Sequence, residues 1–324
     1  MVQKAVHRVS MPNVLITGGA GFIGSHLTTA FVERGHRVRV LDDFSSGRRD
    51  NLAHLGDRFE LVEGDIRDPA RCLEACRDID FVFHQAAVPS VPKSVDDPQT
   101  SHDANINGTF NILRAAVEQN VRRVIYAGSS SAYGDSPHSP KHEGLRPEPL
   151  SPYAVQKCAG EEYARAFFEC WGLETISLRY FNVFGARQDP KSQYAAAIPA
   201  FVTAILRGEP PTVYGDGEQT RDFSHVDNVV HANILAMDVS KTRGEVVNVA
   251  CGNGISVNQV IATVNRLLGT NVRPRYVAPR PGDVRHSCAN VTLARKLLGF
   301  EPLVSFEEGL RRAIDYYREK SRND

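Results

Sequence analysis

The stretch SPYAVQK, residues 151–157, holds a pair of side chains that could do chemistry. Tyr153 and Lys157 lie four positions apart, just after a Ser-Pro pair that is typical of a helix start. Residues at this spacing share one face of a helix, so we expect the phenol and the ammonium to be neighbours. A phenol, with an ordinary pKa of about 10, becomes a usable base when a cation lies beside it. The same spacing is common on solvated helices, so other segments must support this interpretation.

Three consecutive serines, Ser129, Ser130 and Ser131, offer a hydroxyl partner for this pair. They follow the apolar run RRVIYAG, residues 122–128, which indicates a buried strand. In a doubly wound sheet ligands gather at the carboxyl ends of the strands, and the helix that begins near Ser151 can reach the same crevice. A serine hydroxyl there can bind a substrate hydroxyl and relay its proton to the phenol.

A glycine-rich turn near the N-terminus predicts a dinucleotide site. The stretch TGGAGFIGS, residues 17–25, follows an apolar strand and opens a helix. Its glycines let the backbone turn tightly and approach a pyrophosphate at the start of that helix. The stretch fits GxGxxG through Gly19, Gly21 and Gly24, and fits TGxxGxxG through Thr17, Gly18, Gly21 and Gly24.

The acidic pair Asp42 and Asp43 favours NAD over NADP. The pair ends the second predicted strand, roughly 20 residues beyond the glycines, where a carboxylate accepts from the ribose hydroxyls and repels a 2′-phosphate. Arg48 and Arg49 leave the alternative open, because nearby arginines can accommodate that phosphate. Asp65, in GDIRD, either lies at the adenine edge or caps the helix that follows it.

Around these motifs, short apolar runs alternate with helical patterns through the first half of the chain. This order predicts an α/β fold, a Rossmann-like doubly wound parallel sheet with a smaller, discontinuous α/β substrate-binding domain. We expect an NAD-binding domain over residues 1–182, with a returning segment near 225–250, and a mainly substrate-binding domain over 183–324. The last segment places Phe306, Leu310, Ile314 and Tyr317 on one stripe of a closing helix.

Composition excludes several classes of protein. The chain has 324 residues, of which 38 are basic and 38 acidic. The formal net charge is therefore zero and does not favour nucleic-acid binding. No apolar run is long enough to span a membrane, and the N-terminus has no signal-like segment, so we expect a cytoplasmic protein. The six cysteines have no zinc-like spacing, which predicts reduced thiols and no metal site.

Taken in order, the motifs TGGAGFIGS, GDIRD, HQAA, SSSAYGD, SPYAVQK and RYFNVFG resemble the extended short-chain dehydrogenase/reductase family. Within it they are most similar to the NAD-dependent UDP-sugar 4-epimerases, which are isomerases, and in particular to the subgroup acting on UDP-GlcNAc and UDP-glucose. The resemblance implies tightly held NAD and a homodimer whose subunits contact each other through a four-helix bundle. The two helices concerned would cover about 103–119 and 151–170.

By this resemblance Tyr153 is the catalytic base, Lys157 tunes it and anchors the nicotinamide ribose, and Ser129 is the hydroxyl partner. The serine loop is shorter than in many epimerases, so Ser130 or Ser131 could share or take the role of Ser129. The cofactor-binding residues, some carried by the motifs and some by the resemblance, are Gly18, Gly21, Phe22, Ile23, Gly24, Asp42, Asp43, Ser45, Gly47, Asp65, Ile66, Ala86, Ala87, Tyr153, Lys157 and Tyr180.

The implied reaction oxidises C4 of the sugar to a ketone, turns the ketone over in the site and reduces it from the opposite face. Asn182 is implied as a pyrophosphate donor, Arg221 and Arg280 as diphosphate clamps, and Asp283 as a ribose acceptor. The substrate-binding residues are thus Ser90, Ser129, Ser130, Tyr153, Asn182, Ala197, Tyr214, Arg221, Arg280, Asp283 and Ser287.

Ser287 bears on which sugar is used. It matches the position where epimerases restricted to UDP-glucose and UDP-galactose carry a tyrosine, and a serine leaves room at C2 of the sugar. The resemblance therefore implies UDP-GlcNAc and UDP-GalNAc as substrates, with tolerance of the plain hexoses. The alternative is that Ser287 is merely a small packing residue.

Other functions found on the same fold remain alternatives. A 4,6-dehydratase would carry an Asp-Glu pair where this chain has Ser130 and Ser131, which argues against dehydration. A UDP-glucuronate epimerase or decarboxylase stays open, because the sequence does not place the basic residues of the second domain. A non-enzymatic NAD-binding sensor would typically lack the tyrosine, whereas this chain keeps Tyr153 and Lys157.

Overall fold

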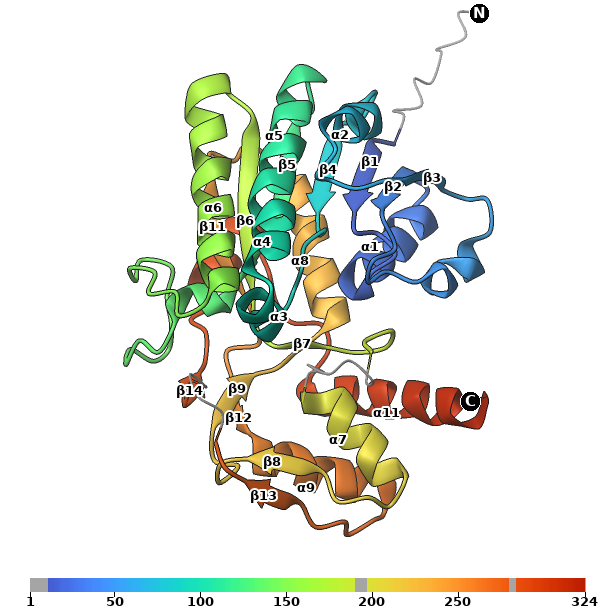
Figure 1. Ribbon diagram of the computed structural model, residues 1–324, viewed down its shortest axis with the longest axis vertical. Helices are drawn as coiled ribbons and strands as arrows, with labels where there is room; N and C mark the ends of the chain where they lie inside the picture. The colour runs from blue at the N-terminus through green and yellow to red at the C-terminus, as the bar shows by residue number, and fades with distance from the viewer. Residues whose placement is uncertain (1–10, 190–196, 280–283, 324) are drawn as a thin grey trace, which may run out of the picture.

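A computed structural model describes residues 11–189, 197–279 and 284–323. Its larger part is built on a parallel sheet of seven strands in the order β11-β6-β5-β4-β1-β2-β3 (Figure 1). The α/β doubly wound fold expected from the alternating pattern is therefore confirmed. The strands are β1 (Asn13–Thr17), β2 (Arg37–Asp42), β3 (Glu60–Glu63), β4 (Phe81–His84), β5 (Arg123–Ser129), β6 (Glu174–Tyr180) and β11 (Glu245–Val249).

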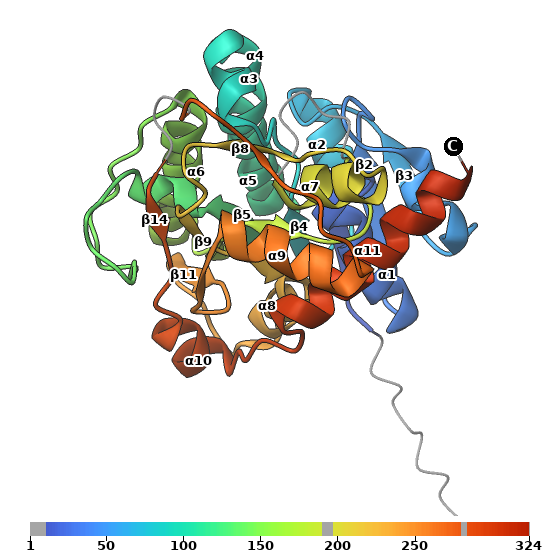
Figure 2. The ribbon, with the colours of Figure 1, turned by 90° about the horizontal axis from the view of Figure 1, so that it is seen from below.

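Helices cover both faces of this sheet because its central strands are apolar on both sides. One face packs against α1, α8 and α10 through Leu27, Val229 and Leu298. The other packs against α2, α5 and α6, and Figure 2 shows the sheet between these two layers. The helices of this part are α1 (Phe22–Glu33), α2 (Pro69–Cys76), α3 (Val91–Asp96), α4 (Pro98–His102), α5 (Thr109–Glu118), α6 (Pro152–Trp171), α8 (Val226–Asp238) and α10 (Thr292–Leu298).

A smaller part lies beyond the carboxyl ends of the sheet strands (Figure 1). Its core joins α7, α9 and α11, and the predicted stripe of the closing helix is buried there at Leu310, Ile314 and Tyr317. Its elements are α7 (Ala197–Leu206), α9 (Val257–Leu268), α11 (Phe306–Asn323), β7 (Val183–Phe184), β8 (Thr212–Tyr214), β9 (Thr220–Asp222), β10 (Ser224–His225), β12 (Gly254–Ser256), β13 (Arg275–Val277) and β14 (His286–Ser287).

The chain crosses between the two parts more than once. Within residues 225–250, β11 pairs in parallel with β6 at the edge of the large sheet. The chain then returns a second time as α10, which packs on α8 and β11 and which the sequence pattern did not indicate. A division near residue 182 stays a prediction. No helix within the described ranges is long and apolar enough to cross a membrane.

Candidate active site

The start of α6 is fixed by three local features. Ser151 caps the helix by accepting from the Ala154 N–H at 3.2 Å, and Pro152 occupies the first turn. The next free N–H, that of Tyr153, donates to the Ser94 hydroxyl of α3 at 3.0 Å. Because the first N–H groups of a helix lack partners within it, these contacts hold the tyrosine in place.

The structure brings Tyr153, Lys157 and Ser129 together. The Lys157 ammonium lies 5.9 Å from the centroid of the Tyr153 ring and donates to the Ala127 carbonyl of β5 at 2.9 Å. The Ser129 hydroxyl, at the end of β5, accepts from the Ser131 hydroxyl at 2.8 Å. The same hydroxyl opposes the rise that burial causes in the pKa of the Tyr153 phenol. Of the three serines, Ser129 is therefore the one that acts on the phenol.

Burial sets the proton affinities of this group. It raises the pKa of Tyr153, and the hydrogen bond with Ser129 opposes that rise. Burial also lowers the pKa of Lys157 to about 8, against the opposing charge of Glu161. The phenol is thus not yet an effective base in the protein alone, and a further positive charge beside it would lower its pKa.

Behind the lysine lies a buried ion pair that the sequence did not reveal. Glu161 is one helical turn beyond Lys157, and its carboxylate accepts from the Arg179 guanidinium at 2.9 Å and 2.7 Å. Both side chains of the pair are 4% exposed. The guanidinium also lies over the ring of Tyr133, 4.6 Å from its centroid.

A buried histidine links the glycine turn to the helices. His84 Nδ1 lies 2.7 Å from the Thr17 hydroxyl, and its Nε2 lies 3.0 Å from the Thr109 hydroxyl. Burial lowers the pKa of His84 to about 3, with the charge of Lys157 adding to the effect. The imidazole is therefore neutral and serves as a fixed hydrogen-bonding group. His84 was not predicted as a site residue, although it is the first residue of the HQAA motif.

The glycine turn has the tight geometry that a pyrophosphate cradle needs. Gly18 has φ +66°, and a Cβ there would meet the Ala86 backbone at 2.8 Å. A Cβ on Gly24 would lie 2.0 Å from the Gly18 carbonyl oxygen. α1 begins directly after this turn at Phe22, with Ile23 in its first turn, so its N-terminal N–H groups face the cradle. The residues present therefore fit a dinucleotide phosphate.

The acids at the end of β2 differ in environment. Asp42 is buried and accepts from the Ala20 and Phe44 N–H groups, each at 2.8 Å. Burial raises the pKa of this carboxyl. Asp43 is exposed and accepts from the Ser45 hydroxyl at 2.6 Å, so it is the more accessible carboxylate. A Cβ on Gly47 would meet Asp42 at 2.6 Å, which explains the glycine there.

Both arginines that kept NADP open have carboxylate partners. Arg48 pairs with Asp189 at 3.1 Å. Arg49 pairs with Glu63, and its guanidinium lies 4.1 Å from the centroid of the Phe44 ring. Because each cation already faces an acid, neither forms a ready site for an additional phosphate.

The remaining cofactor candidates surround the same edge of the sheet. Asp65 accepts from the Arg67 guanidinium at 2.7 Å, and Ile66 is buried against Gly108. Ala86 and its neighbour Ala87 are partly buried in the loop after β4. The Tyr180 hydroxyl contacts Gln85 and Asn233, and burial raises its pKa to about 12.

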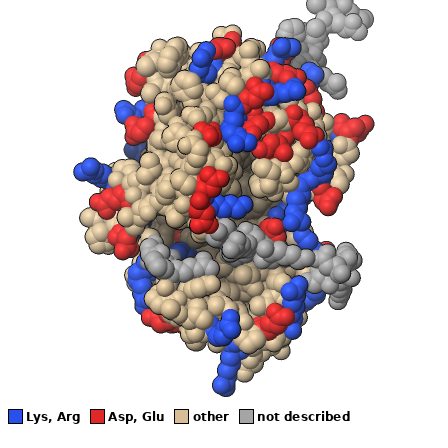
Figure 3. All heavy atoms as spheres, in the orientation of Figure 1, with Lys and Arg blue, Asp and Glu red and all other residues tan. Residues whose placement is uncertain are grey.

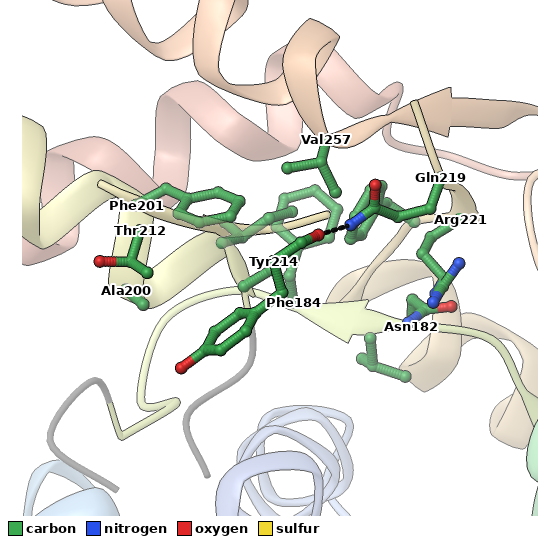
Figure 4. A pocket seen from close by; sticks show the side chains of 13 residues that line it. Asn182, Phe184, Ala200, Phe201, Thr212, Tyr214, Gln219, Arg221 and Val257 are labelled. Carbon is green, nitrogen blue, oxygen red and sulfur yellow. Dashed lines mark hydrogen bonds between the residues drawn. The ribbon is translucent and has the colours of Figure 1, made fainter. Parts of the chain in front are cut away.

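A cavity of about 260 Å³ in the smaller part brings together four of the predicted substrate residues (Figure 4). Asn182, Ala197, Tyr214 and Arg221 line it, and Figure 4 shows Asn182 and Arg221 at the same end. Asn182 has φ +32°, an uncommon conformation outside glycine, at the junction of β6 and β7. None of Ser129, Tyr153 and Lys157 lines this cavity.

The other substrate candidates fall in three places. Ser287 lies on β14 directly opposite Arg221 on β9 in a parallel register. Ser90 caps α3 by accepting from the Lys93 N–H at 3.2 Å. Arg280 and Asp283 lie outside the described residues. Within the described part of the chain, no group of His, Cys, Asp and Glu side chains is arranged to hold a metal ion.

Comparison with known proteins gives consistent matches over nearly the whole chain. The model of the NAD dependent epimerase/dehydratase family matches residues 14–250. A UDP-glucose 4-epimerase of Mycolicibacterium smegmatis is 38% identical over 95% of this chain and 99% of its own.

Two solved structures extend the comparison. The UDP-N-acetylglucosamine 4-epimerase from Methanobrevibacter ruminantium, in complex with UDP-N-acetylmuramic acid, has a TM-score of 0.92 at 39% identity, over 96% of this chain and 99% of that one. A UDP-glucuronic acid 4-epimerase from Bacillus cereus, with UDP-glucuronic acid and NAD, has a TM-score of 0.87 at 32% identity, over 95% and 99%.

Proposed function

Because the chain belongs to the NAD dependent epimerase/dehydratase family, we propose that it is an NAD-dependent 4-epimerase of UDP-sugars, an isomerase. The observation that carries the proposal is the grouping of Ser129, Tyr153 and Lys157 at the carboxyl end of β5. A base, a cation and a hydroxyl close together are what the removal of a proton from a sugar hydroxyl requires. The matched relatives named as UDP-sugar 4-epimerases support the same reaction.

The protein's own residues move the proton and hold the sugar. Bound NAD⁺ supplies the hydride acceptor for C4 and afterwards the donor. Ser129 binds the 4-hydroxyl, and Tyr153 removes its proton and later returns one, with Lys157 holding the phenolate form by its charge. The 4-keto sugar rotates in the site while its nucleotide is held near Asn182 and Arg221. Reduction from the opposite face leaves no net redox change.

The glycine turn and the acidic pair would hold NAD at this edge of the sheet. Gly18, Gly21 and Gly24, where a Cβ would crowd the backbone, would accommodate the pyrophosphate. Asp43, which is exposed next to the buried Asp42, would accept from the adenosine ribose. Lys157 reaches the nicotinamide ribose, and the added positive ring there lowers the pKa of Tyr153 into a usable range.

N-acetylated sugars are the proposed preferred substrates. Ser287 lies opposite Arg221, which we assign to the diphosphate. By the resemblance to the epimerases this position faces C2 of the sugar, where a serine would leave space. A tyrosine at this position would fill that space. The similarity to a UDP-N-acetylglucosamine 4-epimerase supports the assignment. A uronate substrate is the second candidate, because a UDP-glucuronic acid 4-epimerase is also similar over nearly the whole chain.

A homodimer through α5 and α6 is part of the proposal. The outer surface of α6 exposes Val155, Tyr163 and Trp171, the last of them 60% exposed. Figure 3 shows few charges over α5 and α6 compared with the rest of this face. Large apolar side chains grouped on one face are typical of an interface. Trp171→Asp is expected to give a monomer in light scattering, whereas Leu303→Asp, an equally exposed apolar site elsewhere, leaves the dimer intact.

A reducing compartment fits the thiol chemistry. All six cysteines are free, and burial raises the pKa of Cys72 and of Cys76 to about 12, which makes these thiols unreactive. Free thiols of this kind are typical of cytosolic proteins. We therefore place the protein in the cytoplasm. Disulfides found in the tagged protein expressed in cells would show that this assignment is wrong.

The test of the function is an epimerisation assay on the purified protein. UDP-GlcNAc, UDP-glucose and UDP-glucuronate are offered separately, without and then with added NAD, and the products are resolved by NMR. Conversion of UDP-GlcNAc to UDP-GalNAc is the expected result. Conversion of UDP-glucose alone would keep the mechanism and refute the role of Ser287. Conversion of UDP-glucuronate alone would replace the proposed substrate class.

A further inference from the structure

A fully buried carboxylate joins three segments next to the proposed diphosphate site. Asp222, the last residue of β9, is 0% exposed. One of its oxygens accepts from the Cys251 N–H at 2.9 Å. The other accepts from the Gly252 N–H at 3.0 Å and the Ala289 N–H at 3.1 Å. The partners belong to the turn after β11 and to the segment after β14, which are far apart in the sequence.

Two proposed substrate residues depend on the segments that Asp222 joins. Arg221 directly precedes it on β9, and Ser287 lies opposite Arg221 on β14. Ala289, which donates to the carboxylate, is two residues beyond Ser287. The turn at Cys251 follows β11 of the large sheet, so the same carboxylate also ties the small strands to the part that carries Tyr153.

We propose that Asp222 is a positioning residue for the UDP-sugar, which sets the placement of Arg221 and Ser287 relative to each other and to the large sheet. This inference rests on the proposed function. Within the described part of the chain, the Asp222 carboxylate accepts hydrogen bonds from backbone groups, and none of these bonds involves Ser129 or Tyr153. It therefore acts on substrate affinity, whereas the chemical step depends on β5 and α6.

Three backbone donors require a carboxylate at this position. The two oxygens of a carboxylate offer enough lone pairs for all three N–H groups. In Asp222→Asn one oxygen becomes an NH₂ group, which would face a backbone N–H and leave at least one buried donor without an acceptor. Because that donor lies in the turn after β11 or at Ala289, the strand carrying Arg221 or the one carrying Ser287 loses its anchor.

The charge state of the Asp222 carboxylate allows a second test of the proposal, by changing the pH. Burial raises the pKa of Asp222 to about 6, and the backbone N–H groups oppose that rise. Below this pH the wild-type carboxyl carries a proton on one oxygen and resembles the amide of the variant. The affinity of the wild-type protein for UDP-sugars is therefore expected to fall as the pH drops through about 6.

Among residues 11–189, 197–279 and 284–323, the charged and titratable neighbours of Asp222 are few. The Cys251 and Cys288 thiols face it, and burial raises the pKa of both, so they remain neutral. On β14, His286 Nδ1 lies 3.0 Å from the Thr220 hydroxyl of β9. The guanidinium of Arg285 pairs with the Asp216 carboxylate at 2.8 Å and 2.9 Å. His286→Gln removes the imidazole that contacts β9 and is therefore the control for the pH effect.

The experiment measures kcat and KM for the UDP-sugar that the wild-type protein turns over, in the NAD-loaded protein, from about pH 5 to 8.5. Asp222→Asn is expected to raise KM about tenfold or more at pH 8, while kcat stays within about twofold. Its KM should no longer depend on pH near 6. Arg123→Gln is the matched control, because Arg123 is equally buried but lies at the opposite end of β5, where it pairs with Glu174.

Several outcomes would overturn the inference. These are a fall in kcat with unchanged KM, an equal rise of KM in Arg123→Gln, or a wild-type KM that stays constant below pH 6. If Asp222→Asn fails to fold, the pH dependence of KM below pH 6, measured in the wild type and in His286→Gln, tests the positioning role instead. If the wild-type protein turns over no UDP-sugar, the proposed function fails, and calorimetry with UDP tests the positioning role separately. Equal UDP affinity of wild type and Asp222→Asn would then refute it.

Discussion

Replacing Glu161 by glutamine is expected to lower the stability of the protein and to narrow the pH range in which it works. The Glu161 carboxylate is held by two hydrogen bonds from Arg179, at 2.9 Å and 2.7 Å, and both side chains are 4% exposed. Removing the negative charge leaves the Arg179 guanidinium buried against Tyr133 with no compensating carboxylate. The substitution keeps the size of the side chain, so the loss of charge is the main change.

The expected magnitude follows from the burial of the pair. Breaking a buried ion pair by removing one partner costs about 3–5 kcal/mol, because the remaining charge is no longer compensated. With both side chains almost inaccessible, solvent screening reduces this cost little. Natural domains are stable by only about 5–15 kcal/mol, so Glu161→Gln should lose a large share of the total. The double variant Glu161→Gln/Arg179→Met removes both charges and should recover most of the loss.

The same substitution should shift the pH dependence of the reaction. Glu161 opposes the effect of burial, which lowers the pKa of Lys157 from 10.5 to about 8. Without the carboxylate that pKa falls further, so the ammonium beside Tyr153 is lost at a lower pH and the rate should decline there. The stability of the protein changes in the opposite direction to the rate as the pH rises. The reason is that Lys157 binds its proton more tightly in the unfolded chain than in the folded one. The contribution of Lys157 to stability therefore rises as the pH increases from about 8 toward 10.5.

Urea denaturation followed by circular dichroism gives the free energy of unfolding of the wild type, of Glu161→Gln, of Arg179→Met and of the double variant. The epimerase rate at saturating substrate is measured from about pH 6 to 9.5 for wild type and Glu161→Gln. A free energy of unfolding for Glu161→Gln within about 1 kcal/mol of wild type would contradict the buried pair. A double variant no more stable than Glu161→Gln would contradict it as well. An unchanged pH profile would refute the coupling between Glu161 and Lys157.

Three further substitutions test the site itself. Tyr153→Phe should lower kcat by about 10²–10⁴-fold with the fold intact, whereas Tyr276→Phe at an exposed tyrosine on β13 should leave kcat unchanged. Equal kcat values for the two variants would refute the role of Tyr153 as the base. Gly24→Ala should abolish NAD retention, measured by absorbance after denaturation, because its Cβ would lie 2.0 Å from a carbonyl oxygen. Gly254→Ala, whose Cβ would meet Thr220 at 3.5 Å, an ordinary van der Waals distance, should retain NAD. Ser287→Tyr should reduce the rate on UDP-GlcNAc relative to UDP-glucose by about tenfold or more, and an unchanged ratio would leave Ser287 as a packing residue.

The parts of the fold and site that were predictable from the sequence are those encoded within one short segment. The strand, glycine turn and helix at residues 17–25 follow from backbone sterics and apolar runs, and the spacing of Tyr153 and Lys157 follows from the helix period. The capping by Ser151 fixes where that helix begins. These features depend on neighbours in the chain, so the pattern of residue types is sufficient to indicate them.

The sequence could not decide which distant segments meet. Arg48 and Arg49 left NADP open until the structure placed Asp189 and Glu63 against them. Asp42 and Asp43 are adjacent in the chain, yet one is buried under the glycine turn and the other is exposed. The environment of each acid depends on the sheet and the turn that pack around it.

The amino-acid sequence alone thus determined the layered α/β fold, the dinucleotide cradle and the pairing of phenol and ammonium, because each is a local conformation with its own periodicity. Only the tertiary structure decided that Glu161 faces Arg179, that Ser287 lies opposite Arg221 and that Asp222 joins three segments. These contacts require long loops of chain to close, and apolar packing across the whole molecule sets which polar groups are buried together. A buried polar group needs a partner, but its residue type does not say which one.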